Sequence, residues 1–265
     1  MQPWHAQLKL HFERRGERTT VARAHRGPLL MQKALYPEGP EACHAIVLHP
    51  PGGIAGGDAL EISVRADAKA HALVTTPGAA KWYKANGRRA AQDIRLDVAG
   101  ALEWLPQENI VFDAAEVASS LRIDLAAEAC MIGWDITALG RQASGERFAS
   151  GCFAQTIALH IEGELEWLER TRVAGDDAAL AAPVALGGAT VFGCLWAYGP
   201  HWQDEDLDAL RERCAPTLLN PRLLVVRALG PNTERVRDLL EYAWMRLRPR
   251  VFAGRSAQRP RIWAT

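Results

Sequence analysis

Residues 94–98 read IRLDV and residues 121–125 read LRIDL, and both segments alternate apolar with polar side chains. The same alternation occurs in three further segments, QLKLHF (7–12), LEISV (60–64) and IALHI (157–161). Successive side chains of a strand point to opposite faces, so a period of two gathers the apolar residues on one face. Between residues 60 and 170 such segments recur at about ten-residue spacing, with hardly any helical periodicity. The pattern predicts a mainly β fold of many short strands and leaves a layered sandwich, a barrel and a β-solenoid open.

Helical periodicity is confined to two segments near the C-terminal end. Residues 204–214 (DEDLDALRERC) begin with acidic side chains, which complement the helix dipole. The second segment, about 232–248, begins at Asn232, a favourable N-cap, and its apolar stripe ends before Pro249. We therefore expect a single domain over residues 1–265, β-rich over 1–200, with these two helices and an arginine-rich tail at 249–265.

The overall composition is that of a globular protein, with 48% apolar and 23% charged residues. The 31 basic and 31 acidic side chains cancel, so no global charge directs the chain to nucleic acid or to an anionic membrane. The N-terminal segment lacks the apolar core of a signal peptide, and no apolar run reaches the roughly 20 residues of a membrane helix. We expect a soluble, cytoplasmic protein whose five scattered cysteines stay reduced.

The segment HPPGGIAGGD (49–58) concentrates Gly52, Gly53, Gly56 and Gly57 immediately before Asp58. Glycine serves where the backbone needs a positive φ or a close approach, so this segment predicts one specific backbone shape. A phosphate-binding loop would carry lysine and lead into a helix, whereas here an acid and a strand-like segment follow. The context therefore disfavours phosphate binding.

Sequence signatures of catalysis and of tight metal binding are absent. No G-x-S-x-G elbow surrounds a serine, and a carboxylate pair becomes informative only once its separation is known. No H-x-H, H-E-x-x-H or Cys/His cluster occurs. We expect no enzyme activity and no tightly bound cofactor. Scattered carboxylates and histidines leave weak, exchangeable contacts to a divalent ion open.

The tail carries several arginines and no acidic residue, and it ends in PRIWAT with Arg261 and Trp263. A basic run of this kind is usually a solvated face or a loose tail. Because arginine and tryptophan are favoured at interfaces, the alternative is an arm that docks on an acidic partner surface.

Five blocks occur along the chain, HPPGGIAGGD (49–58), TTPGAAKWY (75–83), LEWLPQENIVFD (102–113), LGRQASGERF (139–148) and PRIW (260–263). With these blocks the chain resembles the UreD family of urease accessory proteins, called UreH in some organisms. The resemblance spans nearly the whole sequence. It implies a mostly β, solenoid-like fold with two helices, in agreement with the strand pattern.

The resemblance also implies a function, that of a non-enzymatic maturation factor. Members of the family bind the structural subunits of apo-urease and recruit the accessory protein UreF and the GTPase UreG, and the assembly delivers nickel to the urease active site. An internal nickel tunnel is proposed for the family, which suits a chain that holds Ni²⁺ only transiently. Two alternatives stay open: a purely structural adaptor without nickel contact and, from architecture alone, a β-solenoid enzyme acting on carbohydrate.

Candidate site residues come from the same blocks. Asp58 is expected to present an accessible carboxylate at a passage or partner surface, with the capping of a turn as the structural alternative. Lys81 and Tyr83 would orient the facing surface, and Arg141 and Glu146 would line the path or form a structural ion pair. Asp58 and Glu146 are the candidate transit ligands for metal. The remaining passage or partner candidates are Gly52, Gly53, Gly56, Gly57, Arg261 and Trp263.

Overall fold

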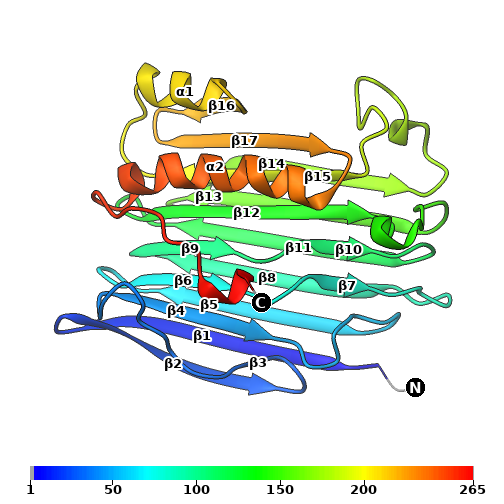
Figure 1. Ribbon diagram of the computed structural model, residues 1–265. Coiled ribbons are helices and arrows are strands. Elements are labelled where there is room, and N and C mark those ends of the chain that lie inside the picture. Colours follow the sequence, from blue (N-terminus) through cyan, green and yellow to red (C-terminus); the bar gives the residue numbers. More distant parts are fainter. Residues whose placement is uncertain (1–2, 265) are drawn as a thin grey trace.

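The computed structural model describes residues 3–264, which form two stacked β-sheets with helices against the outer face of one of them (Figure 1). The first sheet has seven strands in the spatial order β14-β13-β11-β8-β5-β1-β2. Their bounds are β1 His5–Arg15, β2 Arg18–Arg26, β5 Ala59–Ala66, β8 Ala90–Val98, β11 Glu116–Leu125, β13 Cys152–Ile161 and β14 Glu164–Ala174.

The second sheet has ten strands. Its main path is β16-β17-β15-β12-β9-β6-β4-β3, and β10 pairs with both β12 and β7 beside this path. The bounds are β3 Leu30–Met31, β4 Ala42–Leu48, β6 His71–Thr75, β7 Ala80–Trp82, β9 Ala101–Leu105, β10 Asn109–Val111, β12 Cys130–Leu139, β15 Val191–Tyr198, β16 Ala215–Asn220 and β17 Leu223–Gly230.

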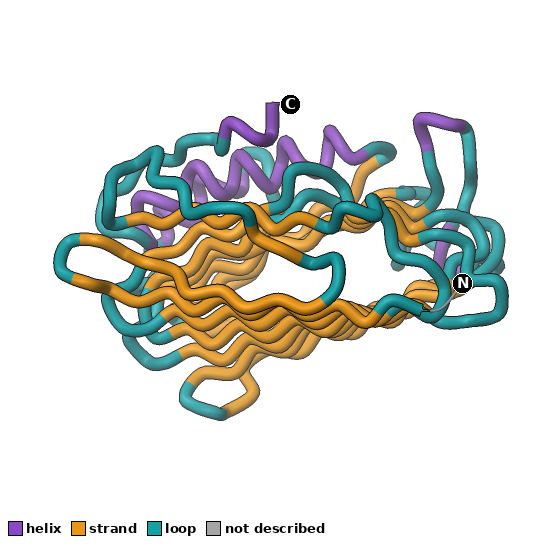
Figure 2. The backbone as a smooth tube through the Cα atoms, turned by 90° about the horizontal axis from the view of Figure 1, so that it is seen from below, coloured by secondary structure: helices purple, strands orange, loops and turns teal. Residues whose placement is uncertain are grey.

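The chain alternates between the two sheets from β4 to β13. Successive strands within each sheet run parallel, as β5, β8, β11 and β13 do in the first and β4, β6, β9 and β12 do in the second. Each pass through both sheets is thus one coil of a solenoid, and Figure 2 looks down the stack of coils and shows the two sheets as separate layers. The prediction of a mainly β, layered fold is confirmed.

Two apolar cores hold the layers together. One fills the space between the sheets and the other lies between the ten-stranded sheet and helix α2. The ten-stranded sheet is therefore covered on both faces, and β12 (CMIGWDITAL) is apolar at almost every position. The seven-stranded sheet has a solvated outer face, which explains the alternation in β8 and β11.

The two helices lie near the C-terminal end, α1 at Asp204–Arg211 and α2 at Thr233–Val251. The prediction that the second helix ends before Pro249 is wrong. Pro249 lies in the last turn, where it still removes one helical hydrogen bond, and the buried side chains of Arg248 and Val251 hold this turn in place. Short 3-10 helices occur at η1 Gln142–Ser144, η2 Ala178–Leu180 and η3 Arg261–Ala264. In the part of the chain that the structure describes, no helix is long and apolar enough to span a membrane.

The sequence pattern does not predict β structure between the two helices. Strands β16 and β17 occupy this region and extend the ten-stranded sheet, so the β-rich part does not stop at residue 200. The antiparallel hairpin of β13 and β14 turns at Glu162 and Gly163, which both have positive φ.

Candidate functional site: an interior polar corridor

One row of polar side chains crosses the inner face of the seven-stranded sheet. Gln92, Ser119, Gln155 and Thr171 are successive register partners on β8, β11, β13 and β14. The residues two positions before and after Ser119 on the same face are apolar and buried. Because the strands pair in register, the four polar positions form a stripe that runs across the strands through an otherwise apolar interior.

Asp135 on β12 meets this stripe from the opposite sheet. Asn109 Nδ2 lies 3.3 Å from Asp135 Oδ2, Thr137 Oγ1 lies 3.3 Å from Oδ1, and the side chain of Gln155 is a third hydrogen-bond partner. Burial raises the pKa of Asp135, while these three hydrogen bonds act to lower it. We call the stripe together with Asn109, Asp135 and Thr137 the corridor.

Two adjoining cavities follow the corridor. The larger, of about 310 Å³, lies under the glycine loop and is lined by His49, while the smaller, of about 50 Å³, reaches Asp135. Since a single water needs only about 10–15 Å³ of such volume, both are large enough for water. The two cavities share the lining residues Val47, Ile62, Thr76, Ala80 and Gln92.

Beyond Asp135 the polar residues continue toward the last coil. Cys194 on β15 and Arg227 on β17 are the next register partners in the same row. Arg227 Nη2 lies 2.6 Å from Glu169 Oε2 on β14, so this ion pair connects the two sheets. Burial raises the pKa of the Cys194 thiol well above its usual range, which keeps the thiol protonated at neutral pH.

Asp58 fixes the glycine loop from inside. Its Oδ1 accepts a hydrogen bond from Trp4 N and its Oδ2 accepts one from Ala55 N, each at 2.8 Å. The prediction of an accessible carboxylate is wrong, because the side chain is buried and backbone N–H groups occupy both oxygens. Asp58 instead caps the turn, as in the structural alternative.

The glycines allow the loop to approach its neighbours closely. Gly52 and Gly53 line the larger cavity. A Cβ added at Gly53 would lie 2.3 Å from the Tyr83 ring, and one at Gly56 would lie 2.0 Å from the carbonyl oxygen of Ala85. Gly57 has φ +98°, a conformation that other residues rarely adopt.

The loop rests on the segment that carries Lys81 and Tyr83. Ile54 N donates to Lys81 O at 2.7 Å, and Tyr83 N donates to Ile54 O at 2.8 Å. The Tyr83 ring also meets Phe112 edge-on, with 5.1 Å between the ring centroids. Lys81 is exposed and lines the larger cavity, so of this pair only Lys81 adjoins the corridor.

Arg141 and Glu146 lie outside the corridor. Arg141 Nη2 is 2.8 Å from Glu146 Oε1, and the guanidinium stacks on Phe112 with 4.6 Å to the ring centroid. The hydrogen bond from Arg141 lowers the pKa of Glu146. The pair is therefore the structural ion pair of the second alternative. Glu146 lines a separate surface pocket of about 500 Å³ instead of the corridor.

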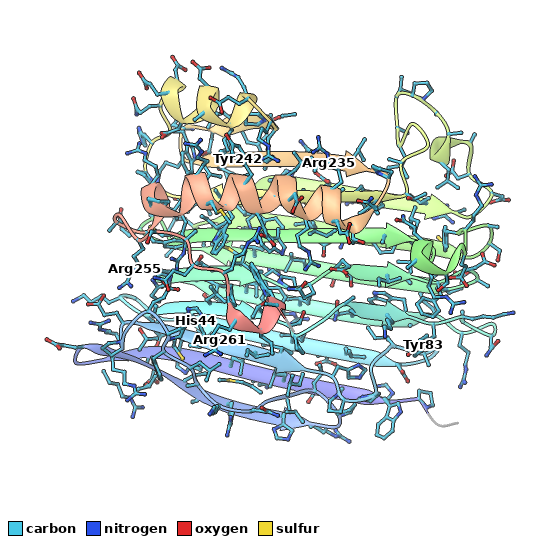
Figure 3. All side chains as sticks on the ribbon, in the orientation of Figure 1. His44, Tyr83, Arg235, Tyr242, Arg255 and Arg261 are labelled. Atoms are coloured by element: carbon cyan, nitrogen blue, oxygen red, sulfur yellow. The ribbon has the colours of Figure 1, made fainter. Side chains whose placement is uncertain are left out.

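The arginine-rich tail docks on the body of the chain, in front of the ten-stranded sheet (Figure 3). Arg255 pairs with Glu41 and Arg259 pairs with Glu241. Trp263 Nε1 donates to Thr75 Oγ1 at 2.8 Å. The expectation of a solvated, loose tail is wrong for these residues. Arg261 is exposed, and its contact with a partner stays a prediction.

Comparison with known proteins decides the family. The family described as "UreD urease accessory protein" matches residues 5–264, which is nearly the whole chain. The chain belongs to the UreD family. Among curated relatives, the urease accessory protein UreD of Ralstonia nicotianae is 45% identical over 99% of this chain and 94% of its own length. The UreD proteins of Azoarcus sp. strain BH72 and Pseudomonas fluorescens are each 47% identical over 99% of this chain, covering 94% and 95% of their lengths.

The sequence reasoning did not identify Asp135 of this UreD-family chain. A signal was present, because Asp135 is an acid within a strand that is apolar on both faces, where only a partnered or functional acid is expected. The row of Gln92 and Gln155 gave a weaker signal, since a polar residue in an alternating strand is ordinarily assigned to the solvated face.

A second unexpected feature of this UreD chain is an ionic cluster under the end of α2. Glu103 on β9 accepts hydrogen bonds from Arg248 Nε and Nη2 at 2.9 Å and from Trp244 Nε1 at 2.8 Å, and it contacts His71 Nε2 at 3.1 Å. Burial would raise the pKa of Glu103, but the hydrogen bonds from His71 and Arg248 lower it to about 2. The cluster is structural, because its acceptors and donors satisfy one another.

Within residues 3–264, three possible ligand side chains lie close enough together to hold one metal ion. The group of three donors that could close on one ion is His11, Glu13 and Asp67, half-exposed at the outer face of the seven-stranded sheet. Arg15 already pairs with Glu13, and Arg65 with Asp67. Within the described residues, the corridor therefore holds no preformed three-donor metal site.

Proposed function

We propose that this chain is a non-catalytic urease maturation factor that binds apo-urease, recruits UreF and UreG, and assists nickel insertion. Its family and the names of its relatives support a role as a urease accessory protein. The proposal includes a cytoplasmic location, no tightly bound cofactor, and Ni²⁺ as a transient cargo. The carbohydrate-enzyme alternative is not carried forward, because the relatives are named as accessory proteins.

The uncompensated carboxylate of Asp135 is the observation that supports a nickel route through the corridor. Burying a carboxylate costs free energy unless a positive charge or hydrogen-bond donors compensate it. Asp135 has three uncharged donors, no cationic partner among the described residues, and a position on an interior cavity. A divalent cation in that cavity would supply the missing positive charge.

The ligand chemistry of the corridor suits passage better than storage. Carboxylate, amide and hydroxyl oxygens hold a hydrated divalent ion weakly when fewer than three converge. His49 adds an imidazole in the larger cavity, a ligand type that suits nickel. Burial lowers the pKa of His49, although Asp58 acts to raise it, so the ring is neutral at neutral pH. A route of this kind can release its cargo to the next protein.

The proposal is tested with Asp135→Asn, which keeps the shape of the side chain and removes its charge. The full-length variant is co-expressed with the urease subunits, UreF and UreG. We expect unchanged co-purification, with a several-fold loss of nickel per urease active site and of urea hydrolysis. Asp93→Asn is the matched control, because Asp93 lies on the solvated face of β8 beside Arg95.

The outcomes separate an adaptor that passes nickel through the corridor from a purely structural adaptor. Full nickel loading with Asp135→Asn would overturn the corridor route and favour the purely structural adaptor. Failure of the unmodified chain to co-purify with urease or UreF would overturn the accessory role itself.

Arg261 gives a separate test of the partner surface. It is exposed on η3, so Arg261→Glu reverses a charge without disturbing the core. We expect weaker co-purification with UreF or urease. Unchanged recovery of both proteins would show that this arginine faces no partner.

A further inference from the structure

The wall of the corridor in the ten-stranded sheet is interrupted at one place. The ladder between β6 and β9 ends at the pair Thr75 and Leu105, and the ladder between β7 and β10 begins at Ala80 and Asn109. Residues 76–79 and 106–108 lie between these ladders, and we call this interruption the window. Thr76, Pro106 and Gln107 of the window line the smaller cavity.

Few backbone hydrogen bonds cross the window, although the Glu108 side chain pairs with Arg237 of α2. Gln107 N donates to Thr76 Oγ1 at 2.9 Å, and Ala80 N donates to Glu108 O at 2.9 Å. A continuous ladder would instead supply regularly repeated backbone bonds along both segments. The interior cavity beside Asp135 is therefore separated from the outer face by loop segments at this point.

The C-terminal end covers the window from outside. Trp263 Nε1 donates to Thr75 Oγ1, which in turn donates to Leu105 O at 2.6 Å. Trp134 Nε1 donates to Pro106 O at 2.7 Å, and the rings of Trp134 and Trp263 are 5.5 Å apart. In Figure 1, η3 is the short red helix beside the C mark, and it lies in front of the sheet between β6 and β7.

This cover is attached more weakly than the elements beneath it. Among residues 255–264 only Pro260 is buried, the helix η3 has no buried residue, and Trp263 itself is only partly buried. The ion pairs of Arg255 and Arg259 each include a solvent-exposed side chain, and exposed pairs contribute little to stability. Segments with few buried contacts open locally without global unfolding.

We propose that residues 255–264 form a removable cover over the window. Trp263 blocks the window when the cover is bound, and displacement of the cover opens a side entrance to the cavity at Asp135. A hydrated divalent cation, or another small cation, could then enter the corridor between its two ends. The link to metal passage rests on the proposed function, whereas the window is tested without metal.

The test uses Ile94→Cys as a reporter, because Ile94 faces the smaller cavity from the opposite sheet. The full-length protein is treated with a cationic methanethiosulfonate, which converts a thiol to a mixed disulfide and releases methanesulfinate. Modification at each cysteine is followed by peptide mass spectrometry. We expect Trp263→Ala to speed modification at position 94 by roughly tenfold, since opening of the cover then limits access. Native Cys43, buried in the core, should keep its rate.

Trp202→Ala is the matched control. Trp202 belongs to the same outer core and also donates its indole N–H to a backbone oxygen, that of Arg222, but it lies away from the window. It should destabilise the chain without speeding modification at position 94. Trp263→Phe keeps an aromatic ring and loses the hydrogen bond to Thr75, so it should speed modification at position 94 less than Trp263→Ala does. This variant replaces Trp263→Ala if the alanine variant fails to fold. Equal rates with and without Trp263, or an equal rise at Cys43, would overturn the proposal.

Discussion

Arg248 of α2 and Glu103 of β9 form a fully buried, two-point ion pair with 2.9 Å at each contact, across 145 positions of the sequence. The pair fastens the end of the helix to the ten-stranded sheet. Taking both charges out of water is costly, so such a pair persists only when its remaining groups are satisfied. Here Trp244 and His71 complete the contacts of Glu103, and Glu38 meets the other side of Arg248.

Removing Arg248 should be among the most damaging single changes in the chain. Arg248→Ala leaves Glu103 and Glu38 buried without their cation, and breaking a buried pair in this way costs about 3–5 kcal/mol. Urea unfolding followed by circular dichroism measures the change. Arg211→Ala is the control, because the exposed pair with Asp208 should contribute no more than about 1 kcal/mol. Similar losses from the two variants would contradict this account.

Glu103 also predicts how stability depends on pH. Its pKa in the folded chain is about 2, below the ordinary 4.5, so the unfolded chain binds the proton more readily. The stabilisation is fully present above pH 4.5 and is lost as the pH falls toward 2, and it amounts to about 3 kcal/mol. Urea unfolding at a series of pH values measures this dependence, and Glu103→Gln should flatten the stability curve between pH 4.5 and pH 2.

The layered β fold could be predicted from sequence because one sheet has a solvated face. Residues 94–98 of β8 alternate strictly, and that pattern determines both strand type and orientation. Strands of the ten-stranded sheet carry little alternation, since apolar residues lie on both faces, and this hides β17 from sequence analysis. The edge strand β16 is short and largely exposed, so it has no buried pattern of its own. The end of α2 was misjudged because a buried ion pair outweighed the usual effect of Pro249.

Less of the candidate site than of the fold could be predicted from the sequence. The glycine loop was identified as one specific backbone shape, but whether the Asp58 carboxylate faced solvent depended on Trp4, 54 positions away. The corridor arises from register between strands of successive coils, and no local pattern encodes which polar residues align. Trp263 was singled out by its residue type, while its contact with Thr75 requires the fold.

Close packing around the glycine loop predicts unequal effects of adding a methyl group. Gly56→Ala would place Cβ 2.0 Å from the Ala85 carbonyl oxygen, and a backbone atom cannot move aside as a side chain can. Gly52 has open space and φ +75°, so Gly52→Ala should cost only the roughly 1 kcal/mol of a strained conformation. Thermal unfolding should show a much larger loss for Gly56→Ala. Equal losses would indicate that the loop is mobile in solution.

Asp58 predicts a difference between two substitutions at one position. Asp58→Ala removes the acceptor of the Trp4 and Ala55 N–H groups, and a hydrogen bond to a charged group contributes about 1.5–3 kcal/mol. Asp58→Asn keeps one side-chain carbonyl oxygen, so it can accept from one of these N–H groups while its amide faces the other. We therefore expect stability to fall in the order wild type, Asp58→Asn, Asp58→Ala, as measured by urea unfolding.

The same order should appear in amide hydrogen exchange at Ala55, because exchange there reports opening of the loop. If Asp58→Ala left both measurements unchanged while nickel loading of co-expressed urease fell, the carboxylate would act on the cargo and not on the loop.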